Sequence, residues 1–183
     1  GVEVAPPPEA PPPVLRFDTP EIGAGGLMML PVVQDDPNRG ASFSGSKYGQ
    51  VALINYAFLP PNGPQSWLFE GNRQLIVADH ALAQRQDGKV LARALAVVMR
   101  DSDGDGTLTA EDAQDLFLTD ADLQGKQLLQ SGIKGLRMAD LMSPDLGGVL
   151  IETEQGLEAL RLALPSGQVI ARQAVAAPEA AVS

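Results

Sequence analysis

The amino-acid sequence predicts a mainly β fold, built of antiparallel sheets in a blade-like or sandwich arrangement. Three observations support this prediction: apolar runs of strand length, turn-forming residues between them and a faint internal repeat. The runs are short, and several are rich in the β-branched or aromatic residues that favour strands. They lie at 50–58, 65–69, 74–77, 148–152 and 160–164.

Turn-forming residues separate these runs. Pro61-Asn62-Gly63, Pro165-Ser166-Gly167 and the segment 144–148 combine proline, glycine and Asn, Asp or Ser. Such clusters between apolar runs are typical of hairpin connections. Hairpins join neighbouring strands that run in opposite directions, and so they predict antiparallel sheets.

The internal repeat relates residues 68–79 to residues 129–140, which share Leu, Gly, Leu and Ala-Asp at the same offsets. Each copy follows a predicted strand and turn, and 160–170 is a partial third copy. The spacing of the first two copies falls to about 45 residues, an ordinary blade length, when the acidic segment 101–112 is counted as an insertion. The repeat therefore predicts blade-like units.

The segment 101–112 carries the strongest chemical signal. Carboxylates at its first, third and fifth positions can converge on one hard cation, and Gly106 permits the sharp turn that this needs. Leu108 supplies an apolar anchor. The predicted calcium ligands are the carboxylates of Asp101, Asp103, Asp105 and Asp112, the Thr107 carbonyl, and the Thr109 hydroxyl or a water that it holds.

This spacing resembles the calcium loop of the EF-hand family. The last position holds Asp112 where that family usually has Glu, which is similar to the dockerin-type variant of the loop. A shorter final ligand implies fewer protein oxygens around the ion or a tighter loop. The alternative is a solvated acidic turn without metal, but four close carboxylates repel one another when no cation is present.

The segments on either side of this loop are harder to assign. Residues 89–100 fit one face of a helix and also one face of a strand, with alanine favouring helix and Val97-Val98 favouring strand. Residues 109–112 resemble a capping box that begins a short helix. We expect a strand, the calcium loop, one short helical turn and a second strand at 116–120. A paired EF-hand is the alternative, and 120–125 lacks the spacing of a second loop.

Residues 50–170 together resemble bacterial exported β-propeller-like proteins, related to the periplasmic propeller component of the Tol system. In that group, a strand, an Asp/Pro-rich turn, Gly and a strand recur, and Asp-rich loops interrupt blades. The predicted structured residues suffice for about three blades, whereas closure typically needs four or more. The resemblance therefore implies an incomplete or irregular sheet arrangement, or a sandwich, and not a ring.

Composition narrows the function classes. The length of 183 residues suits one domain with a real core. The net charge of −10 argues against nucleic acid and anionic membrane surfaces as partners. The chain has no Cys, which excludes disulfides and thiol chemistry. No apolar run approaches the roughly 20 residues that a membrane-spanning helix requires.

The sequence predicts three segments: a Pro-rich flexible linker at 1–20, one β-rich domain at 21–172 and a disordered tail at 173–183. A Pro/Ala/Glu tether before an acidic domain without Cys resembles the start of a mature bacterial lipoprotein. This implies a periplasmic or cell-surface location, with membrane contact only through an N-terminal lipid anchor. The alternatives are an ordinary flexible leader and a ligand for a Pro-binding module.

Signals for catalysis are weak. His80 is the only histidine and follows Asp79, with Ser66 nearby, but no Gly-x-Ser-x-Gly motif is present. The segment 40–45 has the wrong spacing for one. Glu70 and Asp79 fit an acid–base pair for glycoside cleavage, although nothing places them in one cleft. Residues 23–26 lack the partners of a phosphate-binding loop. We expect no enzyme.

The sequence thus predicts a non-catalytic envelope protein in which one structural calcium ion stabilises a β-rich domain. One alternative is a calcium-dependent module that binds an envelope protein or a glycan. Trp67 and Phe69 are the candidates for an exposed platform, although strand residues of this kind more often belong to a core. An exposed Trp67 with a nearby groove would favour this alternative. A calcium sensor with a helical EF-hand is the other alternative.

Overall fold

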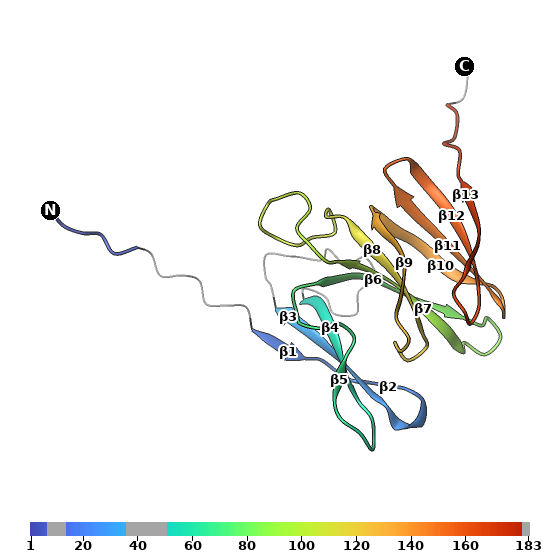
Figure 1. The fold of residues 1–183 in the computed structure, drawn as a ribbon, viewed down its shortest axis with the longest axis horizontal. Helices are drawn as coiled ribbons and strands as arrows, with labels where there is room; N and C mark the ends of the chain where they lie inside the picture. Colours follow the sequence, from blue (N-terminus) through green and yellow to red (C-terminus); the bar gives the residue numbers. More distant parts are fainter. Residues whose placement is uncertain (7–13, 36–50, 181–183) are drawn as a thin grey trace.

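The protein folds into three antiparallel sheets that follow one another along the chain (Figure 1). This computed structural model describes residues 1–6, 14–35 and 51–180. The mainly β fold class predicted from the sequence is confirmed, and the sheets are blade-like. The segment 40–45 and most of the Pro-rich run lie outside the described residues.

The N-terminal sheet has the strand order β1-β3-β4-β5, with β2 paired to β3. The three-residue 3₁₀ helix η1 (Ala24–Gly26) connects β2 to β3. The strands are β1 (Leu15–Phe17), β2 (Glu21–Ile22), β3 (Met28–Asp35), β4 (Val51–Leu59) and β5 (Ser66–Trp67).

The middle and C-terminal sheets are simple meanders, in which each strand pairs with the next one along the chain. The middle sheet comprises β6 (Leu75–Ala83), β7 (Val90–Val98), β8 (Gln114–Asp120) and β9 (Gln127–Ile133). The C-terminal sheet comprises β10 (Gly135–Ser143), β11 (Leu146–Thr153), β12 (Gly156–Ala163) and β13 (Val169–Ala174).

Two large apolar clusters join the sheets into a stack. The first packs side chains of the N-terminal sheet, such as Tyr56 and Phe58, against Leu95 and Phe117 of the middle sheet. The second packs the opposite part of the middle sheet against β10, β11 and β12. A smaller cluster joins β3 and β4 to the paired residues Leu75 and Val98 at the ends of β6 and β7. The middle sheet is therefore covered by both of its neighbours.

The ambiguous segment 89–100 forms strand β7. This strand lies between β6 and β8, and its residues from Ala92 onward are buried. Small alanine side chains allow two neighbouring sheets to approach it closely, which explains why a strand has a helix-like composition. Its cross-strand pairing and burial on both faces outweigh the local helix preference.

The short helix expected after the acidic segment is absent from the described structure, and a single turn replaces it. The Asp112 N–H donates to the Thr109 carbonyl over 3.1 Å, after which the chain enters β8 directly. The Thr109 hydroxyl accepts the Glu111 N–H over 3.2 Å, as a capping residue would. The predicted capping interaction of Thr109 is present, but pairing of β8 with β7 ends the turn before a helix develops.

Two ends of the expected domain differ from the sequence-based boundaries. Within the expected linker, Leu15–Phe17 forms β1, because its residues pair with Val32, Val33 and Gln34 of β3. At the other end, β13 continues to Ala174, and the described residues after it carry no regular secondary structure. None of the helices in the described ranges is long and apolar enough to cross a membrane.

Candidate metal centre

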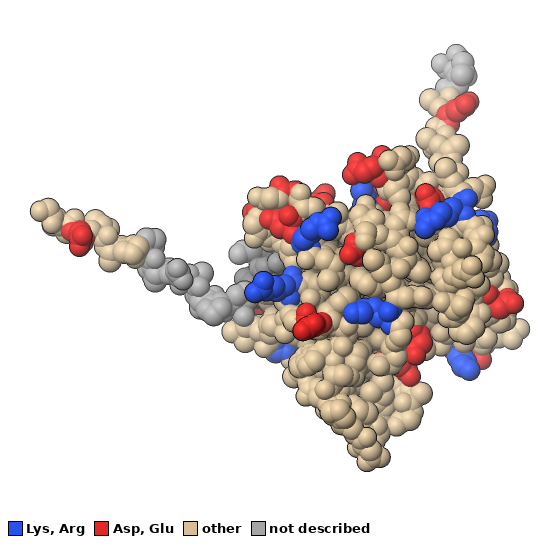
Figure 2. Space-filling view, viewed as in Figure 1, with Lys and Arg blue, Asp and Glu red and all other residues tan. Residues whose placement is uncertain are grey.

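The acidic segment 101–112, called the acidic loop from here on, connects β7 to β8 in the middle sheet. It projects beyond the ends of these strands in Figure 1. Acidic side chains gather over it in the space-filling view of Figure 2. The loop is thus an insertion at the tip of a β-hairpin and does not separate two helices.

The structure brings together three of the predicted ligands. Asp101, Asp103 and Asp105 each offer a carboxylate oxygen, and these oxygens lie within 4.8 Å of one another. Oxygen atoms at such separations can share one hard cation, because calcium binds oxygen ligands at about 2.3–2.6 Å. The Asp-x-Asp-x-Asp spacing therefore produces the convergence that it predicts.

Backbone N–H groups hold these carboxylates in place. The two oxygens of Asp101 accept the N–H groups of Gly104, at 2.9 Å, and Gly106, at 2.8 Å. Asp103 accepts the Asp105 N–H, and Asp105 accepts the Thr107 N–H over 2.9 Å. Gly106 has a φ of +82°, a conformation that glycine adopts without steric cost. The loop backbone therefore turns around its own aspartates.

The electrostatics of the cluster favour the addition of a cation. The backbone hydrogen bond from Asp105 lowers the pKa of Asp103, but a side-chain hydrogen bond with Asp101, desolvation, and a side-chain hydrogen bond and charge from Asp105 outweigh it and raise that pKa to about 6. The carboxylates of Asp101, Asp103 and Asp105 concentrate negative charge in a small volume. A divalent cation would relieve this repulsion.

Asp112 has a different environment from the other three aspartates. It is 1% exposed, and both of its carboxylate oxygens are occupied by loop groups. One oxygen accepts the N–H groups of Ser102, at 2.8 Å, and Asp103, at 3.1 Å. The other accepts the Thr109 N–H over 2.9 Å. Asp112 therefore ties the two ends of the loop together, while its predicted role as a ligand, like those of Thr107 and Thr109, stays a prediction.

The pKa of Asp112 reflects this clamping. Burial raises the pKa of its carboxyl, but backbone hydrogen bonds from Thr109, Asp103 and Ser102 together outweigh burial and hold the pKa below its usual range. Ser102 was missed by the sequence analysis. Its hydroxyl donates to Asp112 over 3.3 Å and accepts the Ala113 N–H over 2.7 Å. A serine at the second loop position is the only sequence signal for it.

Leu108 anchors the loop on the sheets, as the sequence predicts. Its side chain is partly buried and packs against the smaller apolar cluster, which contains residues of β3, β4, β6 and β7. The acidic loop is therefore connected through one leucine to the junction between the N-terminal and middle sheets.

The other candidate residues occupy separate environments. His80 lies on β6 opposite Ala94, whereas Ser66 is exposed on β5. Among the described residues, no hydrogen bond joins His80 to Asp79 or to Ser66. Asp79 instead forms an ion pair with Arg93, and Glu70 is exposed. The described contacts therefore do not bring Ser66, His80 and Asp79 together as a triad. They also do not pair Glu70 with Asp79 as an acid and a base.

The two candidate aromatic residues of the β5 region differ in exposure. Phe69 is buried and packs edge to face against Phe117, with ring centroids 5.4 Å apart. Trp67 is 46% exposed and stacks on Phe17 of β1, which is 49% exposed, with centroids 6.2 Å apart and an interplanar angle of 19°. Phe17 was not a candidate from the sequence, because nothing local links it to a residue fifty positions away.

The fold and the acidic loop define a protein of blade-like antiparallel sheets with an acidic insertion in one hairpin. No protein-family model and no curated protein matches the chain. Among solved structures, the β-propeller domain of the Trilobed protease from Pyrococcus furiosus, described as having an open velcro topology, is similar at 11% identity with a TM-score of 0.41. The match covers 87% of this chain, which spans 42% of the length of that one.

Proposed function

We propose that the acidic loop binds one calcium ion and that this ion stabilises a non-catalytic, β-rich domain. The observation that carries the proposal is the convergence of the Asp101, Asp103 and Asp105 carboxylates in the order Asp-x-Asp-x-Asp-Gly. Calcium would neutralise these carboxylates and relieve the repulsion between them. The Thr107 carbonyl, Thr109, Asp112 and water would complete the coordination.

A structural role is favoured over a regulatory one. Sensor EF-hands change the angle between two helices, whereas the acidic loop is flanked by β7 and β8 of one hairpin. The Asp112 carboxylate accepts the Thr109 N–H and so closes the loop, and Leu108 packs the loop against the smaller apolar cluster. Calcium would therefore strengthen an existing loop conformation and leave the sheets as they are.

The magnitude of the effect follows from mass action. Calcium sites of extracellular modules have dissociation constants of about 10⁻⁴–10⁻³ M. Free calcium at a hundred times the dissociation constant would add about 2.7 kcal/mol to the free energy of unfolding. This is a large share of the stability of a small domain.

Its cellular setting is part of the same proposal. The acidic, Cys-free composition and the Pro-rich N-terminal segment support a bacterial periplasmic or cell-surface protein, held to the membrane by an N-terminal lipid anchor. Millimolar calcium outside the cytoplasm would suit a site of this affinity. The partner would be an envelope protein or a glycan.

Calcium titration by calorimetry tests the proposal, together with thermal melts in calcium and in chelator. Wild type should bind one ion, and Asp101→Ala/Asp105→Ala should abolish binding and the calcium-dependent rise in Tm. Glu111→Gln is the matched control, because Glu111 is an exposed acid of the same loop outside the predicted ligand set. Failure to bind at millimolar calcium would refute the proposal. A large gain of helix on binding would instead indicate a sensor.

A second candidate function is a calcium-dependent binding module, favoured by the exposed pair Phe17 and Trp67. Exposed aromatic side chains provide a surface for sugar rings or apolar peptide residues. Trp67 is the only tryptophan, and its fluorescence therefore reports directly on this surface. A saturable change in Trp67 fluorescence on adding glycans or envelope extracts would support this function if the change is lost in Phe17→Ala and in chelator. A fluorescence change that neither Phe17→Ala nor chelator affects would exclude it.

A further inference from the structure

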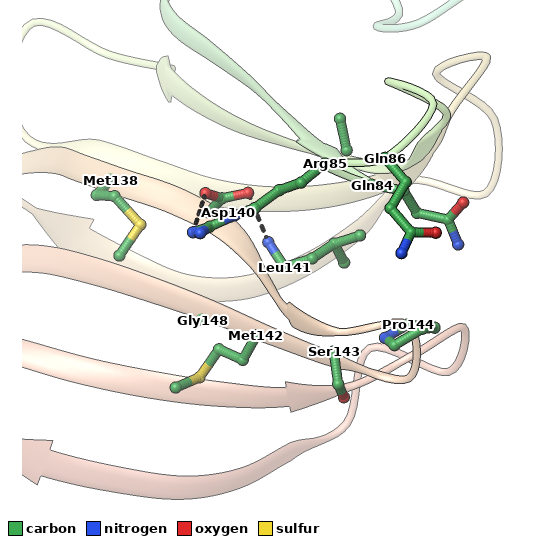
Figure 3. A pocket seen from close by; sticks show the side chains of 11 residues that line it. Gln84, Arg85, Gln86, Met138, Asp140, Leu141, Met142, Ser143, Pro144 and Gly148 are labelled. Carbon is green, nitrogen blue, oxygen red and sulfur yellow. Dashed lines mark hydrogen bonds and ion pairs between the residues drawn. The ribbon is translucent and has the colours of Figure 1, made fainter.

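An open recess lies between the β6–β7 turn and β10, away from the acidic loop (Figure 3). Its volume is about 700 Å³, within the range of roughly 300–1,000 Å³ typical of small-molecule sites. The polar side is formed by residues 84–86, while the β10 side is largely apolar but also carries Asp140 and Ser143. The acidic loop joins β7 to β8, and so the recess is independent of the proposed calcium site.

The apolar side consists mainly of methionine. Met138 and Met142 line the recess and are 43% and 56% exposed. Leu141 and Pro144 extend the same surface. At Gly148 a Cβ atom would lie 3.1 Å from the Met142 sulfur, and so the glycine leaves room for this side chain. Flexible, polarisable methionine side chains adapt well to linear apolar ligands.

The polar side offers one cation with free hydrogen-bonding capacity. The Arg85 side chain is 86% exposed and lies 3.6 Å from an Asp140 carboxylate oxygen, as the dashed line in Figure 3 marks. The other oxygen of Asp140 accepts the Leu141 N–H over 2.8 Å. In the described part of the chain Arg85 donates no hydrogen bond, although a guanidinium has five N–H donors in a fork that matches a carboxylate.

We infer that this recess binds an aliphatic carboxylate, with the hydrocarbon chain against Met138, Leu141 and Met142 and the carboxylate on Arg85. The apolar surface would contact the hydrocarbon chain of the ligand. The unused N–H donors of Arg85 at the rim of the recess would bind its carboxylate. Among the described residues that line the recess, Asp140 is the one carboxylate that a cationic head group could contact, and Arg85 and Leu141 already engage it. The ligand class is therefore an anionic amphiphile of fatty-acid type.

Methionine methyl NMR on the full chain provides the test, with decanoate below its micelle concentration as the probe. Binding should shift the methyl signals of Met138 and Met142 saturably. Met28 and Met99 are internal controls, because they are 37% and 40% exposed but lie outside the recess. Decyltrimethylammonium, with the opposite head-group charge and the same chain, should bind at least tenfold more weakly.

Two arginine variants distinguish recognition from general adsorption. Arg85→Gln should weaken decanoate binding at least tenfold, and the exposed position makes the variant safe for folding. Arg137→Gln is the matched control, since Arg137 is an exposed arginine of β10 that pairs with Glu152 outside the recess. The inference is overturned if decanoate causes no saturable shift at millimolar concentration, if all exposed methionines respond alike, or if Arg85→Gln binds as wild type does.

Discussion

Arg93 and Asp79 lie diagonally opposite each other on β7 and β6, and their ion pair sits at the junction of the N-terminal and middle sheets. Two guanidinium nitrogens of Arg93 donate to Asp79. The third donates to Glu21 of β2 over 3.1 Å, and the guanidinium lies 5.9 Å from the centre of the Tyr56 ring. Burial lowers the pKa of Arg93, but hydrogen bonds and charge from Asp79, aided by Tyr56 and Glu21, outweigh it and raise that pKa. Arg93 therefore stays cationic and connects the two sheets.

Replacing this arginine should be costly. Arg93→Met would remove the cation that faces the partly buried carboxylates of Asp79 and Glu21, and we expect the free energy of unfolding to fall by about 3–5 kcal/mol. Urea unfolding monitored by circular dichroism measures the loss. Arg137→Met, which removes an exposed ion pair with Glu152, should cost less than about 1 kcal/mol. Equal effects of the two variants would contradict a special role for Arg93.

The acidic loop should contribute a pH-dependent stability through Asp112. Because hydrogen bonds hold the pKa of Asp112 below its unfolded value of about 3.9, its contribution is present above that pH and is lost as the pH falls through the lower, folded value. Asp112→Asn should therefore lower the free energy of unfolding by about 1–3 kcal/mol at pH 7. Urea unfolding in chelator should show a difference in free energy of unfolding between this variant and wild type at pH 7 that becomes smaller at pH 3. A difference independent of pH would contradict the clamp.

Gly106→Ala should affect both stability and calcium binding. The change forces an alanine into a φ of +82° with no steric neighbour, and so the cost is backbone strain of about 1–2 kcal/mol. It would also disturb the N–H that orients Asp101. Gly88→Ala, with a φ of +71° in the β6–β7 turn, is the control: its strain is similar, but calorimetric calcium affinity should be unchanged. Equal calcium affinities of the two variants would show that the Gly106 turn is not required.

We expect Asn55 to stabilise the fold beside the first apolar cluster, which contains its hydrogen-bond partners Tyr56 and Phe69. Its buried side-chain oxygen accepts the N–H groups of Tyr56 and Phe69, while its amide donates to the carbonyls of Phe69 and Gly71. Asn55→Ala would leave several of these groups unsatisfied and should cost about 2–3 kcal/mol in chemical denaturation. Asn72→Ala, which removes an exposed partner of the same amide, should cost well under half of that.

Sequence-based prediction succeeds where the interacting residues are close together in the sequence and fails where they are far apart. The acidic cluster was foreseeable because its aspartates lie within five residues, and the loop backbone alone brings them together. The strands 51–59 and 146–153 follow from local apolar runs between turns. In contrast, β7 has a local helix preference that only its two neighbouring strands overcome. The partnership of Arg93 with Glu21 joins residues 72 positions apart and leaves no local pattern.

The same reasoning explains the remaining differences. Thr109 and the acids after it carry a genuine capping signal, but Asp112 turns inward to bind loop N–H groups and the chain enters β8. The recess between the β6–β7 turn and β10 joins segments more than fifty residues apart, and so its arginine and methionines carry no recognisable spacing. Local sequence patterns thus predict loops and strands, while tertiary packing decides the surfaces between sheets.

The hydrogen bond from Leu141 to Asp140 also bears on the behaviour of this protein at high concentration. β10 is an edge strand of the C-terminal sheet, and unpaired N–H groups along such edges can recruit further strands and initiate fibril growth. In the middle of β10, the Asp140 carboxylate accepts the Leu141 N–H, and Arg85 forms an ion pair with the same carboxylate. An incoming strand would have to displace both charged groups, and so this edge should resist intermolecular cross-β association.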